Sequence, residues 1–155
     1  MPREYGQVCP MARSLEIVGE RWTMLIVRDL LVGPQKFQDL ATSLGAATAL
    51  LARRLKLLEE HGIIAKRLYT SHPPRAEYVL TDRGTELRTV ARALTIWGSK
   101  HLAGKRVLVH RQCDHPIEMA YRCAHCDETL PLADIAYRTE AMVPRRKATT
   151  HKAAQ

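Results

Sequence analysis

The stretch ATALLARRLKLLEEH, residues 47–61, decides the fold that we expect. It holds no glycine or proline, and Leu51, Leu55 and Leu58 recur at the spacing of one helix face. An α-helix turns by about 100° per residue. The opposite face therefore carries small and basic side chains, namely Ala49, Ala52, Arg53 and Lys56. Together with Thr48 at the start of the helix, these residues are the predicted DNA-contacting set.

A shorter helix is predicted just before it, over residues 36–44, and Gly45 is placed to end that helix. The three residues Gly45-Ala46-Ala47 then form a turn of the length that a helix-turn-helix uses. On this arrangement Lys36 and Lys56 are expected to contact phosphates, whereas Arg53 can offer a bidentate fork to guanine or contact a phosphate.

Further helices and a hairpin complete the pattern. We expect helices over 10–18 and 21–32, strands over 63–69 and 76–80, and a long helix from 81–82 to about 102. Two prolines in the loop 70–75 should exclude regular strand from the hairpin tip. Arg67, His72 and Arg75 place positive or titratable groups on this hairpin, where minor-groove or phosphate contacts are expected. The sequence therefore predicts a mainly α winged helix-turn-helix with a small β-hairpin.

Charge and composition agree with a nucleic-acid partner. The chain has 155 residues, is 46% hydrophobic and carries a formal net charge of +8. Such a charge favours double-stranded DNA, with an anionic membrane surface or an ordinary solvated surface as alternatives. No apolar run approaches the roughly 20 residues of a membrane span, and residues 1–5 lack the apolar segment of a signal peptide. We expect a cytoplasmic protein without a membrane partner.

Six motifs occur in order between Tyr5 and His101: CPM (9–11), GERWT (19–23), LVGPQKFQDL (31–40), RRLKLLEEHGII (53–64), PRAEYVLTDRG (74–84) and IWG (96–98). In these motifs the chain resembles the HxlR-type winged helix-turn-helix regulators. The resemblance implies a dimeric, operator-binding transcriptional regulator that often controls a neighbouring divergent gene.

The chain departs from that family before the expected recognition helix. Family members commonly have Ser and then Pro there, with another Ser further in, whereas this chain reads Ala46-Ala47-Thr48 and Ala52. The N-cap hydroxyl is therefore displaced to Thr48 or lost, at a cost of about 1 kcal/mol. The operator sequence does not follow from the remaining side chains.

The last long helix carries a narrow apolar seam. Leu87, Val90, Leu94 and Trp97 fall at i, i+3, i+7 and i+10, a heptad-like spacing that ordinary packing on the winged domain would also produce. The resemblance favours a homodimer seam built from this helix and the first one. Two-fold symmetry then predicts an inverted-repeat operator.

Cys9 precedes Pro10 at a helix start, where the helix dipole favours a thiolate. Oxidants could then produce a disulfide across the dimer or a mixed disulfide, as some regulators that resemble this chain do with the matching cysteine. An inert or structural thiol is the alternative.

Residues 104–143 contain two short Cys/His pairs, His110-x2-Cys113 and Cys123-x2-Cys126. Two such pairs can close tetrahedrally on one structural zinc ion, with His115 as a substitute for His110. Free thiols, or a disulfide within the second pair, are alternatives. We therefore expect a winged domain over 1–103, a zinc-ribbon-like extension over 104–143 and a disordered basic tail over 144–155.

Enzyme motifs are missing from the sequence. It has no Gly-rich phosphate loop, no Gly-x-Ser-x-Gly and no His-Glu-x-x-His, so we expect no catalytic residues. The alternative functions are a protein-interaction module or a non-specific DNA binder, acting through the basic surface and the extension. No polar cluster points to a small-molecule effector.

Overall fold

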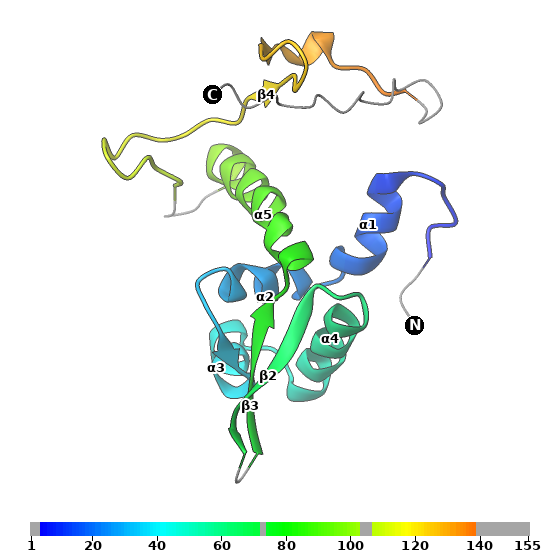
Figure 1. Cartoon of the computed structure of the whole chain (residues 1–155), viewed down its shortest axis with the longest axis vertical. Coiled ribbons are helices and arrows are strands. Elements are labelled where there is room, and N and C mark those ends of the chain that lie inside the picture. Colours follow the sequence, from blue (N-terminus) through cyan, green and yellow to red (C-terminus); the bar gives the residue numbers. More distant parts are fainter. Residues whose placement is uncertain (1–3, 72–73, 103–106, 139–155) are drawn as a thin grey trace, which may run out of the picture. The chain divides into compact units, whose positions relative to one another are not determined.

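The computed structural model describes residues 4–71, 74–102 and 107–138 (Figure 1). Its helices are α1 (Pro10–Val18), α2 (Thr23–Leu30), α3 (Phe37–Leu44), α4 (Thr48–Glu60), α5 (Asp82–His101) and the short 3-10 turn η1 (Leu132–Asp134). Its strands are β1 (Gln35–Lys36), β2 (Ile64–Ser71), β3 (Pro74–Leu80), β4 (Tyr121–Arg122) and β5 (Thr129–Leu130). The chain divides into one unit up to residue 117 and a second from residue 118. None of the described helices is both long and apolar enough to cross a bilayer.

The first unit is a winged helix-turn-helix. Helices α2, α3 and α4 pack with the antiparallel sheet β1-β3-β2, and the β2–β3 hairpin projects from them as the wing (Figure 1). The core consists of buried aliphatic side chains, namely Ile26, Val27, Leu30, Leu40, Leu44, Leu51, Leu55, Leu58, Ile63 and Ile64. The leucine stripe predicted for residues 47–61 is therefore confirmed as the face that α4 buries.

The wing is longer than we expected. Strand pairing continues from Ile64↔Leu80 to Ser71↔Pro74, with an irregularity between Leu68 and Thr70. The expectation that prolines exclude strand from the tip is wrong for Pro74. It is the first residue of β3, where the missing N–H of proline is tolerated.

Lys36 does not begin a helix, which corrects the predicted range 36–44. It lies in β1, where Gln35 pairs with Tyr78 and Lys36 with Glu77, and its backbone is extended. The helix starts at Phe37, and Asp39 accepts a hydrogen bond from the Lys36 N–H at 3.3 Å.

Tyr78 of the central strand has a raised pKa. Its burial is the larger cause, and the negative charge of the Glu59 carboxylate is the smaller one.

Helix α2 is also shorter than the predicted range 21–32: it starts at Thr23, because Trp22 at its N-cap adopts a left-handed backbone with φ of 79°, and it ends at Leu30. Helix α5 starts as expected: the Thr81 side chain caps it by accepting from the Gly84 N–H at 3.1 Å. Gly84 lies very close to Ile63, a residue of the connection between α4 and β2. A Cβ at position 84 would stand 2.0 Å from the Ile63 carbonyl oxygen. This contact sets how α5 leaves the wing.

Candidate nucleic-acid interface

Helix α4 presents the small and basic face that its sequence predicts. Thr48, Ala49, Ala52, Arg53 and Lys56 are all exposed, while the leucine stripe opposite them is buried. The N-cap residue is Ala47, which makes no side-chain cap hydrogen bond. The capping hydroxyl is therefore lost and not displaced, because Thr48 already lies inside the helix.

The two adjacent arginines of α4 have different environments. The Arg53 side chain makes no hydrogen bond or ion pair with another described residue. Arg54 instead turns inward, and its Nη2 donates to Oε2 of Glu20 at 2.6 Å, with the arginine side chain only 18% exposed. The sequence pattern did not predict this pair. The available signal was its position, since Arg54 lies one helical turn from both Leu51 and Leu58 on the buried side.

Lys56 and Lys36 flank that face. Lys56 Nζ lies 3.7 Å from Glu60 Oε1, but both side chains are well exposed, so this ion pair is weak. Lys36 Nζ lies 5.1 Å from the centre of the Tyr69 ring, a cation–π contact between β1 and the wing. Both ammonium groups therefore remain accessible to phosphates.

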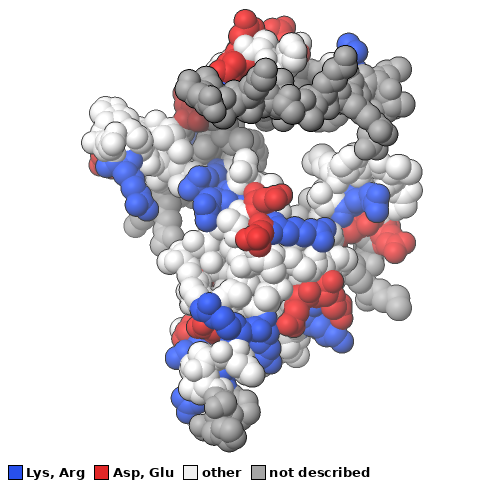
Figure 2. Space-filling model, viewed as in Figure 1, with Lys and Arg blue, Asp and Glu red and all other residues white. Residues whose placement is uncertain are grey.

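The wing carries further positive charge, and Figure 2 shows Lys and Arg side chains gathered over the part of the molecule where the β2–β3 hairpin lies. Arg67 donates from Nε at 2.9 Å and from Nη2 at 2.6 Å to the same oxygen of Glu77. Arg75 is exposed, and so is Lys66, which was not among the predicted DNA-contacting residues. His72 lies outside the described residues. The wing thus offers two exposed cations, Lys66 and Arg75, and one arginine, Arg67, that is already paired with Glu77.

An apolar groove of about 580 Å³ runs along α1, α2 and α5. Its lining includes Met11, Leu15, Val18, Trp22, Leu25, Leu87, Val90 and Leu94. The four residues of the predicted seam differ in burial. Leu87 packs against the core, whereas the side chains of Val90, Leu94 and Trp97 are 43%, 54% and 57% exposed. Ordinary packing within the winged unit therefore accounts for Leu87 only.

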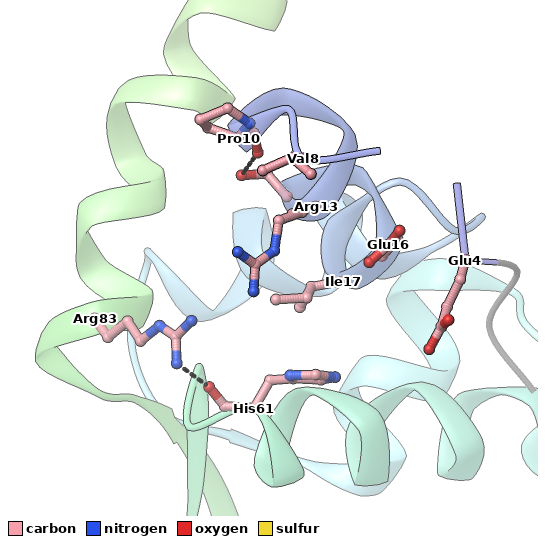
Figure 3. A pocket seen from close by; sticks show the side chains of 9 residues that line it. Glu4, Val8, Pro10, Arg13, Glu16, Ile17, His61 and Arg83 are labelled. Atoms are coloured by element: carbon pink, nitrogen blue, oxygen red, sulfur yellow. Dashed lines mark hydrogen bonds between the residues drawn. The ribbon is translucent and has the colours of Figure 1, made fainter. Parts of the chain in front are cut away.

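Cys9 is exposed and is the N-cap residue of α1. Its neighbours Val8 and Pro10 line a separate open pocket of about 970 Å³ between α1, the end of α4 and the start of α5 (Figure 3). Arg83 Nη1 donates to the His61 carbonyl at 2.8 Å there. Two arginines and two glutamates line this pocket, so its formal charges balance and favour neither anions nor cations.

The predicted metal ligands form two separate pairs. His110 Nδ1 lies 3.2 Å from Cys113 Sγ. Backbone N–H groups of Cys126 and His125 and the Cys126 side chain lower the pKa of Cys123 by hydrogen bonding. Within the described ranges no group of three or more Cys, His, Asp or Glu side chains could hold a metal ion. The zinc site stays a prediction.

Comparison with known proteins decides the family. Residues 17–106 match the HxlR-like helix-turn-helix family. This chain is a member of that family. It is 36% identical to the uncharacterized HTH-type transcriptional regulator Rv3095 of Mycobacterium tuberculosis over 129 residues, 81% of this chain and 82% of the relative. The HxlR-type chain is thus a DNA-binding transcriptional regulator, which confirms the resemblance seen in its motifs.

Two solved structures place the HxlR-type chain among transcription factors. PA1607, described as a putative transcription factor, superposes with a TM-score of 0.74 at 32% identity, covering 86% of this chain and 96% of that one. The oxidized form of the redox regulator HypR superposes with a TM-score of 0.58 at 25% identity, covering 62% of this chain and all of that one.

Proposed function

We propose that this HxlR-type regulator binds an inverted-repeat operator as a homodimer, with α4 in the major groove. One observation carries the proposal: the exposed face of α4 combines small side chains with two cations while its other face is locked into the core. Ala49 and Ala52 let the helix backbone approach the base edges closely. Arg53 then supplies the strongest base or phosphate contact of that face.

The remaining cations fix the helix on the duplex. Lys56 and Lys36 reach phosphates on either side of the α4 contact, and Arg75 does so from the wing. Such contacts carry no sequence information but contribute to affinity and make it depend on salt. Sequence preference in this protein therefore rests on Arg53 and on the shape of the operator.

The homodimer follows from the exposed apolar surface. Leu94 and Trp97 on α5 and Met11 on α1 are more than half exposed in the protomer. Met11 and Leu94 line the apolar groove, and Trp97 follows Leu94 one turn later on α5. A group of large exposed apolar side chains marks a protein interface. A second copy related by two-fold symmetry would cover them with the same surface and would set two α4 helices one DNA turn apart.

Cys9 is the proposed redox-responsive group of the regulator. Its thiol is exposed at a helix N-terminus, and the similar structure HypR is described as a redox regulator. Two Cys9 thiols would give up two protons and two electrons to an oxidant such as diamide and form one disulfide between protomers. That disulfide would fix the distance and orientation between the two α1 helices. It would thereby alter the distance between the two α4 helices.

The test is fluorescence anisotropy with the DNA that flanks the protein's own gene, at fixed salt and with scrambled duplex as competitor. Arg53→Glu with Lys56→Glu should abolish operator binding, whereas Arg88→Glu with Arg92→Glu, an equal charge change on two exposed residues of α5, should retain it. Binding that scrambled DNA displaces fully would show a non-specific DNA binder instead. Binding that survives the α4 substitutions would show that α4 is not the recognition helix.

The same assay tests Cys9. Diamide should reduce or enhance operator affinity of the wild type by several-fold and leave Cys9→Ser unchanged. Non-reducing electrophoresis should show a covalent dimer only when Cys9 is present. Equal responses of the two proteins would remove Cys9 from the mechanism.

A further inference from the structure

Strand β2 contains one residue more than the part of β3 that it pairs with. Leu68 pairs with Ala76 and Thr70 pairs with Arg75, so two steps along β2 correspond to one step along β3. No residue of β3 stands opposite Tyr69, which is therefore the extra residue of a β-bulge. A bulge of this kind redirects a side chain out of the regular alternation of its strand. The orientation of the Tyr69 ring is thus not set by a cross-strand neighbour in β3.

The Tyr69 ring meets a lysine from outside the hairpin. Lys36 Nζ lies 5.1 Å from the centre of the ring, within the range of a cation–π interaction. Lys36 belongs to β1 and directly precedes α3, and its backbone N–H donates to Asp39 of that helix. Lys36 is exposed, and Tyr69 is 39% exposed. The contact therefore joins the wing to the start of the helix-turn-helix at the surface of the molecule.

The carboxylate nearest to Lys36 in the sheet is already paired with another cation. Lys36 and Arg67 both stand opposite Glu77, one from β1 and the other from β2. Directly opposite residues of antiparallel strands carry their side chains on the same face, so the three residues form a row across the sheet. Glu77 forms its ion pair with Arg67, which donates to Oε1 from both Nε and Nη2. Lys36 contacts the Tyr69 ring instead.

A ring and a carboxylate hold a cation with different consequences for its charge. A carboxylate balances the positive charge, whereas an aromatic ring attracts the cation through its quadrupole and carries no net charge. Lys36 therefore keeps its full positive charge, while the charge of Arg67 is balanced by Glu77. Affinity for DNA depends on the number of phosphates that the protein neutralises. Of the two cations in the row, Lys36 is the one prepared for a phosphate.

The same contact reduces the entropic cost of binding a phosphate. A lysine side chain has a flexible four-carbon stem, and fixing it costs rotamer freedom. The Tyr69 ring restricts the Lys36 ammonium before DNA binds, and Asp39 fixes the backbone of the same residue. Preorganisation of this kind raises affinity because less freedom is lost on binding.

We propose that Tyr69 is a positioning residue for DNA binding: its ring, released from the strand pairing by the bulge, holds the Lys36 ammonium where it contacts one DNA phosphate. The proposal rests on the proposed binding of DNA by α4 and the wing, and it adds a residue that contributes through Lys36. A phosphate contact carries no sequence information. Tyr69 therefore contributes to affinity for any duplex and not to the choice of operator.

The experiment is a double-mutant cycle, measured by fluorescence anisotropy on the DNA that flanks the gene at several salt concentrations. Lys36→Met removes the ammonium and should reduce the slope of log K against log salt by about 0.9, the value for one phosphate. Tyr69→Leu should lower affinity by about two- to five-fold, the change that an exposed cation–π contact produces. In the Lys36→Met background, Tyr69→Leu should have no further effect, because no cation remains to be positioned.

Two further variants separate the ring from other roles of the residue. Tyr69→Phe keeps the aromatic face and should restore most of the affinity that Tyr69→Leu loses. Tyr121→Leu is the matched control, since it makes the same exchange at an exposed tyrosine of β4, and it should bind DNA as the wild type does. Urea unfolding of every variant distinguishes a loss of stability from the loss of a DNA contact.

Three results would overturn the role of Tyr69: wild-type affinity in Tyr69→Leu, the same loss from Tyr69→Leu with and without Lys36, or the same loss in Tyr69→Phe as in Tyr69→Leu. Scrambled duplex gives a separate answer for the proposed operator recognition, because the cycle needs only phosphates. A protein that binds both duplexes equally and still shows this cycle would lose its proposed operator and retain the role of Tyr69.

Discussion

Arg54 of α4 and Glu20, in the turn between α1 and α2, form a 2.6 Å charge-assisted hydrogen bond. It joins two segments that are 34 residues apart in the chain, and its arginine directly follows the exposed Arg53 in the sequence. Helix α4 is therefore held by its leucine stripe and also by a polar contact at its side. Because the pair is partly buried, it constrains how far α4 can rotate about its own axis.

Glu20→Gln should weaken this constraint without changing the size of the side chain. We expect the free energy of unfolding to fall by about 1–2 kcal/mol and operator affinity to fall further than stability alone explains. Glu86→Gln, an exposed residue of α5, is the control for the lost charge. Urea unfolding combined with DNA titration checks both quantities. An unchanged operator affinity would show that the leucine stripe alone orients α4.

Gly84→Ala tests the close approach of α5 to the root of the wing. The added Cβ would meet the Ile63 carbonyl oxygen at 2.0 Å, and because that oxygen belongs to the backbone, relief requires the helix or the Ile63 backbone to move. We expect a loss of about 3 kcal/mol or more in the free energy of unfolding. Thermal unfolding monitored by circular dichroism measures it.

Gly98→Ala is the matched substitution on the same helix. A Cβ at this position meets nothing within 4 Å, so the exchange should stabilise α5 by up to about 1 kcal/mol through helix propensity. A strongly destabilised Gly98→Ala would show instead that a second copy packs closely against this part of α5. A Gly84→Ala protein as stable as the wild type would contradict the described approach.

Glu77→Gln should release Arg67, which donates two hydrogen bonds to one oxygen of Glu77 in the wild type. The freed guanidinium can contact a phosphate, and a negative charge near DNA disappears. We expect tighter operator binding and a slope of log K against log salt that is steeper by about 0.9. Glu118→Gln, an equal charge change outside the wing, should leave the slope unchanged. Weaker binding would show that Glu77 holds Arg67 in its DNA-contacting orientation.

Leu94→Glu should convert the regulator into a monomer, because it places a charge in the middle of the exposed seam on α5. Light scattering after size-exclusion chromatography measures the mass, and operator affinity should fall with it, since one α4 helix reads only a half-site. Arg92→Glu lies on the side of α5 away from the seam and should stay dimeric. A dimeric Leu94→Glu would place the interface elsewhere.

Local sequence determined the two faces of helix α4. The 3.6-residue period of Leu51, Leu55 and Leu58 fixes which face of α4 is buried, and the same period leaves Arg53 and Lys56 on the other face. Residues that cap the start of a helix, such as Thr81, and glycines that end a helix act over only a few residues. For that reason the helices begin and end close to their predicted positions.

Only the tertiary structure decided the long-range pairs. Lys36 belongs to a strand because it pairs with Glu77, about 40 residues later, and no local preference encodes that partner. Arg54 and Arg53 are identical neighbours in sequence, yet one meets Glu20 and the other faces outward. The turns that start at His110 and Cys123 share one pattern of backbone hydrogen bonds, in which the first N–H donates to the sixth carbonyl and the fifth N–H to the first carbonyl. The differing side chains of the two turns do not reveal this likeness. Periodicity thus specifies which face of an element is buried, whereas the groups that meet that face come from distant parts of the chain and are fixed only when it folds.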